Sequence, residues 1–272
     1  MKLSERCEHG FVYETIAGCG LYSAPQFKRT GLVKHGFTSR IGGVSEAPFD
    51  TLNMGLRRPD AQSNLRENYR RVCAALHIDA DALTCVNYAH GPNVALPARD
   101  QIGAGVFKPD LPFECDGIVT NRKDTALLTL HADCLPVFLL DEAGVIGLCH
   151  AGWRGVEGGI IEKTFEKMQT LGSRAQNCYA AIGPGIARCC FEVDAPVAEL
   201  FLRFGMDVVR PYGEKYKVDL YEITVRQLAA LGFEPKRVTL FDGCTCCDEA
   251  HFFSARRDKG KTGAMAALMQ LV

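Results

Sequence analysis

The residues best suited to chemistry in this sequence are a cysteine and a histidine that flank two apolar runs. In the stretch HADCLPVFLLDEAGVIGLCHAGWRG, residues 131–155, Cys134 stands before PVFLLD and His150 directly follows VIGLC. The two runs predict a β-hairpin that turns near Glu142 and Ala143. Residues that face each other across an antiparallel pair have numbers with a constant sum, about 284 for this turn, so we expect Cys134 directly opposite His150.

A third side chain would turn this pair into a metal site, because the pair alone fits a buried thiol beside a buried histidine equally well. His90 in NYAHGPNV follows the apolar LTCV and precedes a Gly-Pro turn, so we expect it at a strand end. Two histidines and one cysteine leave a tetrahedral Zn²⁺ with one open position, which is typical of catalytic zinc. Asp133 and His131 are candidate second partners of the ligands. Strand alternation argues against His131 as a fourth ligand.

Two further segments carry candidate substrate contacts. The glycine-rich stretch AGWRGVEGG follows His150 and leads into a predicted helix, so Arg154 is expected to help hold a carboxylate or phosphate. The stretch FTSRIGGVSEAPFDTLNMG, residues 37–55, has no apolar periodicity and predicts a long functional loop, with Arg40 and Asn53 as candidate contacts. Each of these side chains could instead brace a loop or lie at the surface.

The chain has thirteen cysteines, an odd number that cannot all pair within it. Because the N-terminus MKLSERCEHG has no apolar export signal, we expect a cytoplasmic protein with reduced thiols, most of them buried as small apolar side chains. The stretch CTCC at 244–247 has no second C-x-x-C pair to complete it, so we do not expect zinc there. The stretch IGPGIARCCFEV at 182–193 predicts a tight turn in preference to a phosphate-binding loop.

The predicted secondary structure supplies the scaffold for these side chains. Strands are predicted where short apolar or alternating runs end in turn residues, at 10–16, 31–40, 117–120, 126–130, 136–141, 145–149, 178–183 and 237–241. Amphipathic periodicity predicts helices at 62–77, 156–171, 194–204 and 219–231. The strands come mostly as hairpins, which favours mixed sheets with helices packed outside over a doubly wound parallel sheet.

Length and composition limit the class of protein. The 272 residues are 47% hydrophobic and 23% charged, with no internal repeat or linker, so we expect one domain over residues 1–272. The 31 basic and 32 acidic residues form no basic block, so nucleic acid is not expected as a partner. Apolar runs such as LPVFLL are too short to span a membrane.

Seven sequence blocks occur in the order found in the YfiH/YlmD-like family, also described as the multicopper polyphenol oxidoreductase (laccase) or purine nucleoside phosphorylase family. They are FTSRIGGVSEAPFDTLNMG, AHGPNV, DGIVT, ADCLPVFLLD, GLCHAGWRG, IGPGIARCCFEV and FFSARRDKGKTGAMA. The resemblance runs from about residue 32 to the C-terminus and leaves residues 1–31 as a less characteristic segment.

This resemblance implies a fold and a metal site. The implied fold is a single α/β (α+β) domain with a layered α/β/β/α core of mixed sheets, of the kind shared with a deamidating toxin domain. The implied metal is Zn²⁺, with Cu²⁺ as the alternative, bound by His90, Cys134 and His150, which are also the catalytic residues. Tyr88 stands where the family often has Gln, and His131 stands where Thr is common, so these departures bear on substrate preference.

The resemblance also implies a reaction, the phosphorolysis of adenosine, inosine and methylthioadenosine, with adenosine deaminase activity in addition. We expect phosphate to attack the anomeric carbon of the ribose, with Arg40 and Arg154 positioning phosphate or ribose and Asp133 as a candidate proton donor. Attack by water on the purine C6 would give deamination. Purine nucleosides and phosphate are therefore the expected partners of a monomer or small homo-oligomer.

Three other functions stay open at this point. Copper-dependent polyphenol oxidation fits a two-His, one-Cys set, although none of the seven histidines forms the His-x-His motifs of a multicopper cluster. A cysteine hydrolase, including a peptidoglycan-editing enzyme, would use Cys134 as nucleophile and His150 as base. A non-catalytic metal-binding protein would have a closed fourth coordination position.

Overall fold

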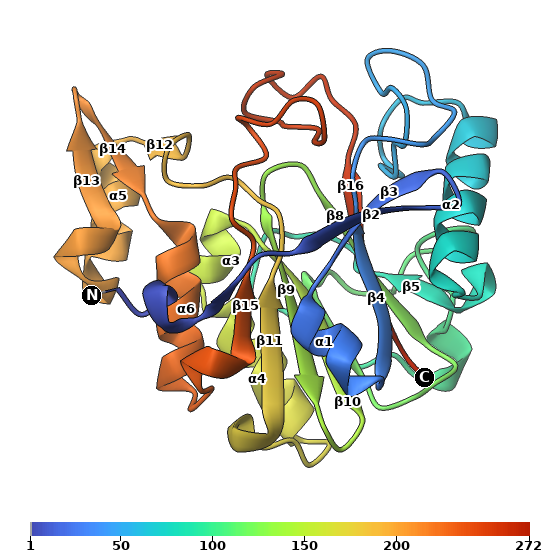
Figure 1. Cartoon of the computed structure of the whole chain (residues 1–272), viewed down its shortest axis with the longest axis horizontal. Coiled ribbons are helices and arrows are strands. Elements are labelled where there is room, and N and C mark those ends of the chain that lie inside the picture. Colours follow the sequence, from blue (N-terminus) through green and yellow to red (C-terminus); the bar gives the residue numbers. More distant parts are fainter. Residues whose placement is uncertain (1) are drawn as a thin grey trace.

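Two large β-sheets stack on each other in the computed structural model, which describes residues 2–272 (Figure 1). The seven-stranded sheet has the order β1 (Glu8–His9), β15 (Val238–Leu240), β11 (Cys178–Ile182), β9 (Leu135–Asp141), β10 (Val145–Ala151), β7 (Gly117–Thr120) and β6 (Val94–Ala95). The six-stranded sheet has the order β2 (Val12–Ile16), β3 (Cys19–Ser23), β4 (Val33–Thr38), β16 (Met265–Leu271), β8 (Ala126–His131) and β5 (Leu83–Cys85). A small third sheet contains β12 (Glu192–Val193), β14 (Lys215–Val218) and β13 (Val209–Tyr212).

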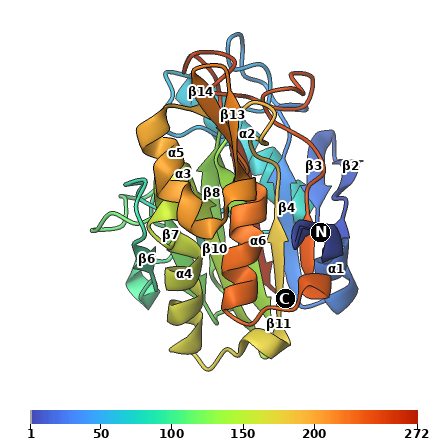
Figure 2. The same ribbon diagram turned by 90° about the vertical axis from the view of Figure 1, so that its left-hand side faces the viewer.

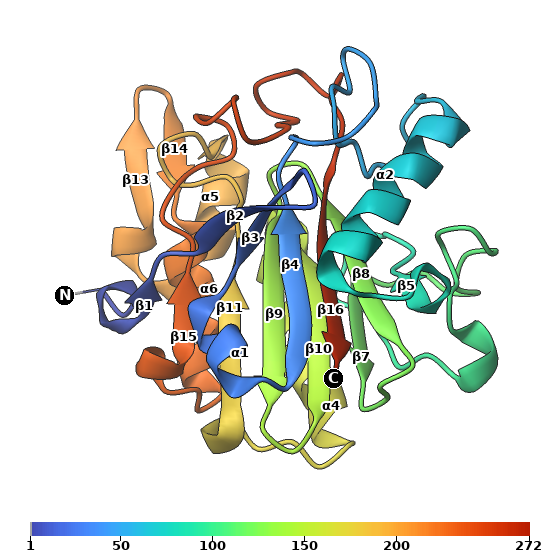
Figure 3. The same ribbon diagram turned by 45° about the vertical axis from the view of Figure 1, so that its right-hand side comes forward.

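Helices cover the outer faces of the two large sheets. The α-helices are α1 (Pro25–Thr30), α2 (Gln62–Leu76), α3 (Trp153–Glu157), α4 (Ile160–Gln169), α5 (Ala195–Phe201) and α6 (Leu220–Ala230). Short 3-10 helices occur at Ser4–Arg6, Ala80–Ala82, Arg99–Gln101, Ala175–Asn177, Leu202–Phe204, Met206–Val208 and Pro235–Arg237. Helices α4 and α6 lie over one face of the seven-stranded sheet (Figure 2), and α2 lies beside the six-stranded sheet (Figure 3). Among residues 2–272, no helix combines the length and apolar character needed to cross a membrane.

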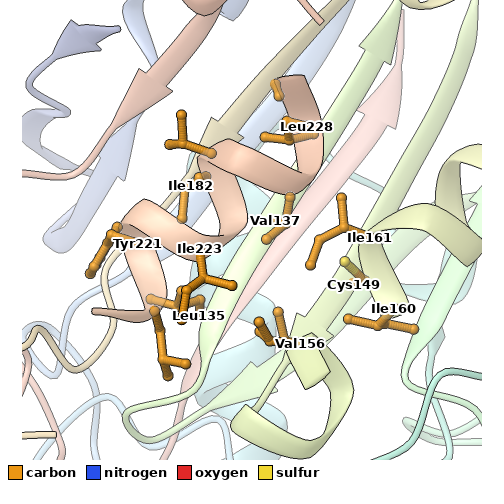
Figure 4. Close-up of a cluster of buried hydrophobic side chains, with 14 of the residues drawn as sticks. Leu135, Val137, Cys149, Val156, Ile160, Ile161, Ile182, Tyr221, Ile223 and Leu228 are labelled. Carbon is orange, nitrogen blue, oxygen red and sulfur yellow. The ribbon is translucent and has the colours of Figure 1, made fainter. Parts of the chain in front are cut away.

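The central strands are apolar throughout because both of their faces are covered. In β9, Val137 and Leu139 point toward the helices, where Val137 meets Leu228 and Ile161 (Figure 4). The alternate residues of β9 point into the core between the sheets, which also takes side chains from β16 and β8. A third core lies between the six-stranded sheet and α2. The expected mixed sheets and layered α/β/β/α core are therefore confirmed.

The predicted elements differ from the structure at a few places. The helix predicted at 156–171 is divided into α3 and α4 at Gly158 and Gly159, since Gly159 has a φ of 82° that an α-helix cannot include. The predicted strands 117–120 and 126–130 do form, but as β7 and β8 they join different sheets. Strand β16, near the middle of the six-stranded sheet, was not predicted; its sequence MAALMQL contains good helix formers, and its strand pairing comes from β4 and β8.

Candidate metal and active site

The predicted hairpin forms from β9 and β10, but its register differs from the expected one. His150 lies opposite Pro136 and Ala151 lies opposite Leu135, so by extension Cys134 faces Gly152 and not His150. The cause is a three-residue turn centred on Ala143, in which Gly144 has a φ of 86°. Because this shift keeps Cys134 and His150 an even number of positions apart across the pair, they stay on the same face as diagonal neighbours.

The glycine opposite Cys134 shows where the three predicted ligand residues meet. A Cβ atom added to Gly152 would lie 3.1 Å from Cys134 Sγ, 3.6 Å from His150 Cε1 and 3.8 Å from His90 Cδ2. The rings of His90 and His150 are nearly perpendicular, with centroids 5.2 Å apart. The structure therefore brings a thiol from one strand, an imidazole from the next and an imidazole from a distant loop around one point.

His90 lies in a loop that follows β5, with a left-handed φ of 56°. This conformation is uncommon for a residue other than glycine and is maintained by the surroundings.

The candidate ligands are not the most tightly gathered set in the structure. Among residues 2–272, the potential metal ligands whose ligand atoms all lie within 4.8 Å of one another are four other cysteines. His90, Cys134 and His150 are gathered more loosely, and His90 is exposed.

Asp116 organises both histidines, although it was not among the site residues expected from the sequence. Its Oδ1 lies 2.9 Å from Nδ1 of His150, which leaves Nε2 as the nitrogen available to a metal. Its Oδ2 accepts hydrogen bonds from the backbone N–H groups of Ala89 at 3.0 Å and Gly91 at 2.9 Å, on either side of His90. A carboxylate that orients a metal-binding histidine is a common feature of zinc sites. The donor set and its support thus fit a bound zinc ion.

Burial and nearby charges shift the pKa values of three residues at the site. Burial alone would lower the pKa of His150, but the charge of Cys134 and the hydrogen bond to Asp116 outweigh it and raise that pKa to about 9. Burial opposes ionisation of Asp116, yet the hydrogen bonds from His150 and from two backbone N–H groups hold its pKa below the ordinary value. Burial and the nearby His150 lower the pKa of His90. Metal binding must displace the proton on His150, so metal affinity should fall as the pH falls.

His131 and Tyr88 support the site from the side of the six-stranded sheet. His131 is buried, and its ring nitrogens lie 2.9 Å from the Cys134 carbonyl oxygen and 2.7 Å from Thr129 Oγ1. With both nitrogens occupied, His131 braces the backbone of Cys134, in keeping with a supporting role. The hydroxyl of Tyr88 accepts a hydrogen bond from the backbone N–H of Leu130, and its ring meets His150 edge-on at 5.0 Å.

The three ligand candidates line a pocket of about 660 Å³, a size suited to a small organic ligand. Three cationic side chains share its wall: Arg57, Arg58 and Lys108. Arg57 donates to Asn87 Oδ1 at 2.6 Å, and Arg58 donates to the Gly260 carbonyl oxygen at 3.3 Å. None of the three was predicted from the sequence, although the adjacent arginines stand just after the long loop 37–55, where two neighbouring cations suggest an anion site.

The expected substrate contacts lie outside this pocket. Within residues 2–272, its wall contains neither Arg40 nor Asn53. Arg40 pairs with Asp50 at 3.0 Å and lines a separate hollow. Asn53 is fully buried and braces the loop, with Oδ1 accepting from the backbone N–H groups of Gly55 at 2.9 Å and Ala264 at 3.0 Å. Arg154 stacks on the Trp153 ring at 4.2 Å and lies near enough to His90 to help lower its pKa.

The contacts of Asp133 indicate that it stabilises the loops around Cys134. It is buried, with a φ of 91°. Its Oδ1 accepts from Thr245 Oγ1 at 2.7 Å, and its Oδ2 accepts from Ser254 Oγ at 2.9 Å and from the Arg256 backbone N–H at 2.7 Å. Its carbonyl oxygen accepts from the Ile186 backbone N–H at 2.7 Å. Asp133 therefore joins three loops directly beside Cys134, and its carboxylate is turned toward these donors.

Fold and site together define a class: layered, mixed α/β proteins in which two imidazoles and a thiol line an open pocket. The chain belongs to the family described as multi-copper polyphenol oxidoreductase laccase, whose model matches residues 34–272. Relatives and solved structures named YfiH and YlmD confirm the resemblance seen in the sequence.

Individual relatives cover nearly the whole chain. It is 37% identical over 260 residues to a purine nucleoside phosphorylase of Deinococcus radiodurans, covering 94% of this chain and 95% of that protein. It is 36% identical over 243 residues to purine nucleoside phosphorylase YlmD of Geobacillus stearothermophilus, covering 86% and 88% of the two chains. The crystal structure of the hypothetical protein YfiH of Bacillus licheniformis superimposes with a TM-score of 0.87 at 28% identity, covering 96% and 99%. The names of the first two relatives indicate an enzyme.

Proposed function

We propose that this protein is a zinc-dependent purine nucleoside phosphorylase that acts on adenosine, inosine and methylthioadenosine and also deaminates adenosine. The observation that carries this proposal is the meeting of His90, Cys134 and His150 around one point in a pocket that also presents cationic side chains. The names of the relatives support the phosphorylase activity. A cytoplasmic location fits the thirteen free cysteines, since thiols stay reduced there.

The three ligand residues bind the metal, and Asp116 fixes the tautomer of His150. When bound, zinc supplies a Lewis acid and lowers the pKa of a bound water. Two imidazoles and one thiolate would fill three of the four positions usual for zinc, so a substrate atom or water in the pocket could take the fourth. Two imidazoles and one thiolate can also bind copper, so the choice of zinc over copper is itself part of the proposal.

The cationic wall of the pocket binds phosphate. Arg57, Arg58 and Lys108 take the role expected of Arg40, because they line the pocket and Arg40 lies elsewhere. A phosphate oxygen forms a bond to the anomeric carbon of the ribose, the bond from that carbon to the purine nitrogen breaks, and the purine leaves with a proton. In the deamination, water adds at the purine C6 and ammonia leaves.

The test uses purified zinc-loaded protein with inosine and phosphate. We expect hypoxanthine and ribose 1-phosphate in equal amounts, and no hypoxanthine when phosphate is omitted. With adenosine, we expect inosine to form even without phosphate. Cys134→Ser should abolish both reactions, whereas Cys7→Ser should retain them, because Cys7 lies in the N-terminal segment outside the pocket. Failure of zinc-loaded and copper-loaded protein to release base would refute the phosphorylase proposal.

Copper-dependent phenol oxidation is the alternative named by the family description. It requires that copper-loaded protein consume oxygen with a phenolic substrate, and that zinc-loaded protein does not. Oxygen uptake by the copper form together with no base release by the zinc form would favour this alternative.

A further inference from the structure

A second group of thiols gathers outside the pocket. Cys189 and Cys190 lie in the loop after β11, and Cys244 and Cys247 lie in the loop after β15. Strands β11 and β15 are parallel neighbours, so both loops leave the same edge of the seven-stranded sheet (Figure 1). The four sulfur atoms all lie within 4.8 Å of one another. Zinc was not expected at CTCC because the sequence has no second C-x-x-C pair, but the fold brings two adjacent cysteines, Cys189 and Cys190, to it from another loop.

We propose that Cys189, Cys190, Cys244 and Cys247 form a structural zinc site. This inference does not depend on the proposed function, since none of the four lines the catalytic pocket. Four thiolates around one ion are the closed, tetrahedral set typical of structural zinc. A catalytic site would keep a position open, as a zinc ion held by His90, Cys134 and His150 would.

The sulfur separations fit a shared ion. Cys189 Sγ lies 3.7 Å from Cys247 Sγ, and Cys190 Sγ lies 3.3 Å from the same atom. Tetrahedral ligands at a zinc–sulfur distance of about 2.3 Å lie about 3.8 Å apart, so the thiols are already close to the spacing that zinc requires. A disulfide would need two sulfurs at about 2.05 Å, and it would engage only two of the four.

The backbone around Cys244 is arranged to support a thiolate. The N–H group of Ala187 donates to Cys244 Sγ at 3.3 Å, across the two loops. The N–H group of Cys247 donates to the Cys244 carbonyl oxygen at 3.1 Å, which closes the turn that carries both thiols. Cys244 is buried, whereas Cys189 and Cys247 are exposed, so an ion can enter from the surface.

A metal at this position would stabilise the backbone that carries Cys134. Thr245 lies between two of the proposed ligands, and its hydroxyl donates to Asp133 Oδ1 at 2.7 Å. The N–H group of Thr245 donates to the Gly185 carbonyl oxygen at 3.0 Å, and the next residue, Ile186, donates to the Asp133 carbonyl oxygen at 2.7 Å. Both cysteine loops therefore hold Asp133, the residue directly before Cys134. By fixing the two loops to each other, zinc acts on the catalytic pocket as a positioning group.

The test separates the two metal sites by removing one at a time. In protein with His90→Ala and Cys134→Ala, elemental analysis should find one zinc per chain, and X-ray absorption should show four sulfur neighbours at about 2.3 Å. Adding Cys189→Ser and Cys247→Ser should remove that zinc. Cys246→Ser is the matched control, since Cys246 belongs to the same CTCC stretch but not to the group of four, and it should retain the zinc.

A ligand-preserving variant separates metal binding from folding. Cys247→His replaces a thiolate by another zinc ligand, so we expect it to keep one zinc per chain where Cys247→Ser loses it. Zinc content unaffected by Cys189→Ser and Cys247→Ser would overturn the proposal. A disulfide between these cysteines in freshly purified, unreduced protein, or iron in place of zinc, would also overturn it.

Discussion

Replacing Asp116 by asparagine should weaken metal binding while keeping the shape of the side chain. One carboxylate oxygen of Asp116 lies 2.9 Å from His150 Nδ1, and the other accepts from the backbone N–H groups of Ala89 and Gly91. An amide has only one oxygen. The asparagine can therefore accept from His150 or from the loop of His90, and it must turn its NH₂ group toward the other.

The expected size of the effect follows from these contacts. A hydrogen bond to a charged group contributes about 1.5–3 kcal/mol, and a tenfold change in an equilibrium constant corresponds to about 1.4 kcal/mol. We therefore expect zinc affinity at the site to fall about 10- to 100-fold, the range usual for a carboxylate that orients a metal ligand. Because Asp116 is fully buried, the free energy of unfolding should also fall, by about 1–3 kcal/mol.

Competition with a coloured zinc chelator measures this affinity. The background should carry Cys189→Ser and Cys247→Ser, so that metal held by the four cysteines does not contribute. Asp110→Asn is the matched control, because Asp110 also lines the pocket but pairs with Arg57 at 3.4 Å instead of a metal ligand. Equal zinc affinity for Asp116→Asn and Asp110→Asn would refute the reasoning.

Three further predictions concern the pocket, its anion site and the core. Gly152→Ala should lower zinc affinity with little change in melting temperature, because the backbone at φ −67° accepts alanine while the new Cβ lies 3.1 Å from Cys134 Sγ; an unchanged affinity would contradict this. Arg58→Gln should raise the KM for phosphate about tenfold, as expected for loss of one charge-assisted hydrogen bond, whereas Arg70→Gln on the exposed side of α2 should leave it unchanged; steady-state kinetics at varied phosphate tests both. Burial, together with the charge of Lys28, lowers the pKa of His35 from 6.5 to about 4, so the unfolded chain binds a proton in a range where the folded chain does not. The stability contributed by neutral His35 is present above pH 6.5 and is lost as the pH falls toward 4, by about 3 kcal/mol in total. Urea denaturation at pH 7 and pH 5 should therefore show a smaller change in the free energy of unfolding for His35→Gln than for the unchanged protein.

The sequence was sufficient for the parts of the molecule that depend on local patterns. The alternation and length of the apolar runs predict the hairpin. Because Cys134 and His150 are separated by an even number of positions across the strand pair, the sequence also places them on one face. The register of the two strands depends on the centre of the turn, which lies at Ala143 and not between Glu142 and Ala143. A glycine at 144 permits this three-residue turn but does not require it. The sequence therefore predicts which face of the hairpin carries Cys134, but not which residue lies opposite it.

The missed residues act through contacts between segments far apart in the chain. Asp116 gains its role only when β7 pairs with β10 and the loop of His90 folds over both. The cysteines at 189 and 190 meet Cys244 because two parallel strands end at one edge, and no sequence spacing encodes that meeting. Strand β16 has the composition of a helix and is a strand because its neighbours on both sides pair with it.

The most direct test of the metal centre is a crystal of zinc-loaded protein measured on both sides of the zinc absorption edge. We expect an anomalous peak within about 2.0–2.3 Å of an imidazole nitrogen of His90, Nε2 of His150 and Sγ of Cys134, with a fourth ligand position facing the pocket. A well-ordered pocket with no anomalous peak between these three side chains, or a peak with its fourth position closed by a protein side chain, would contradict the account.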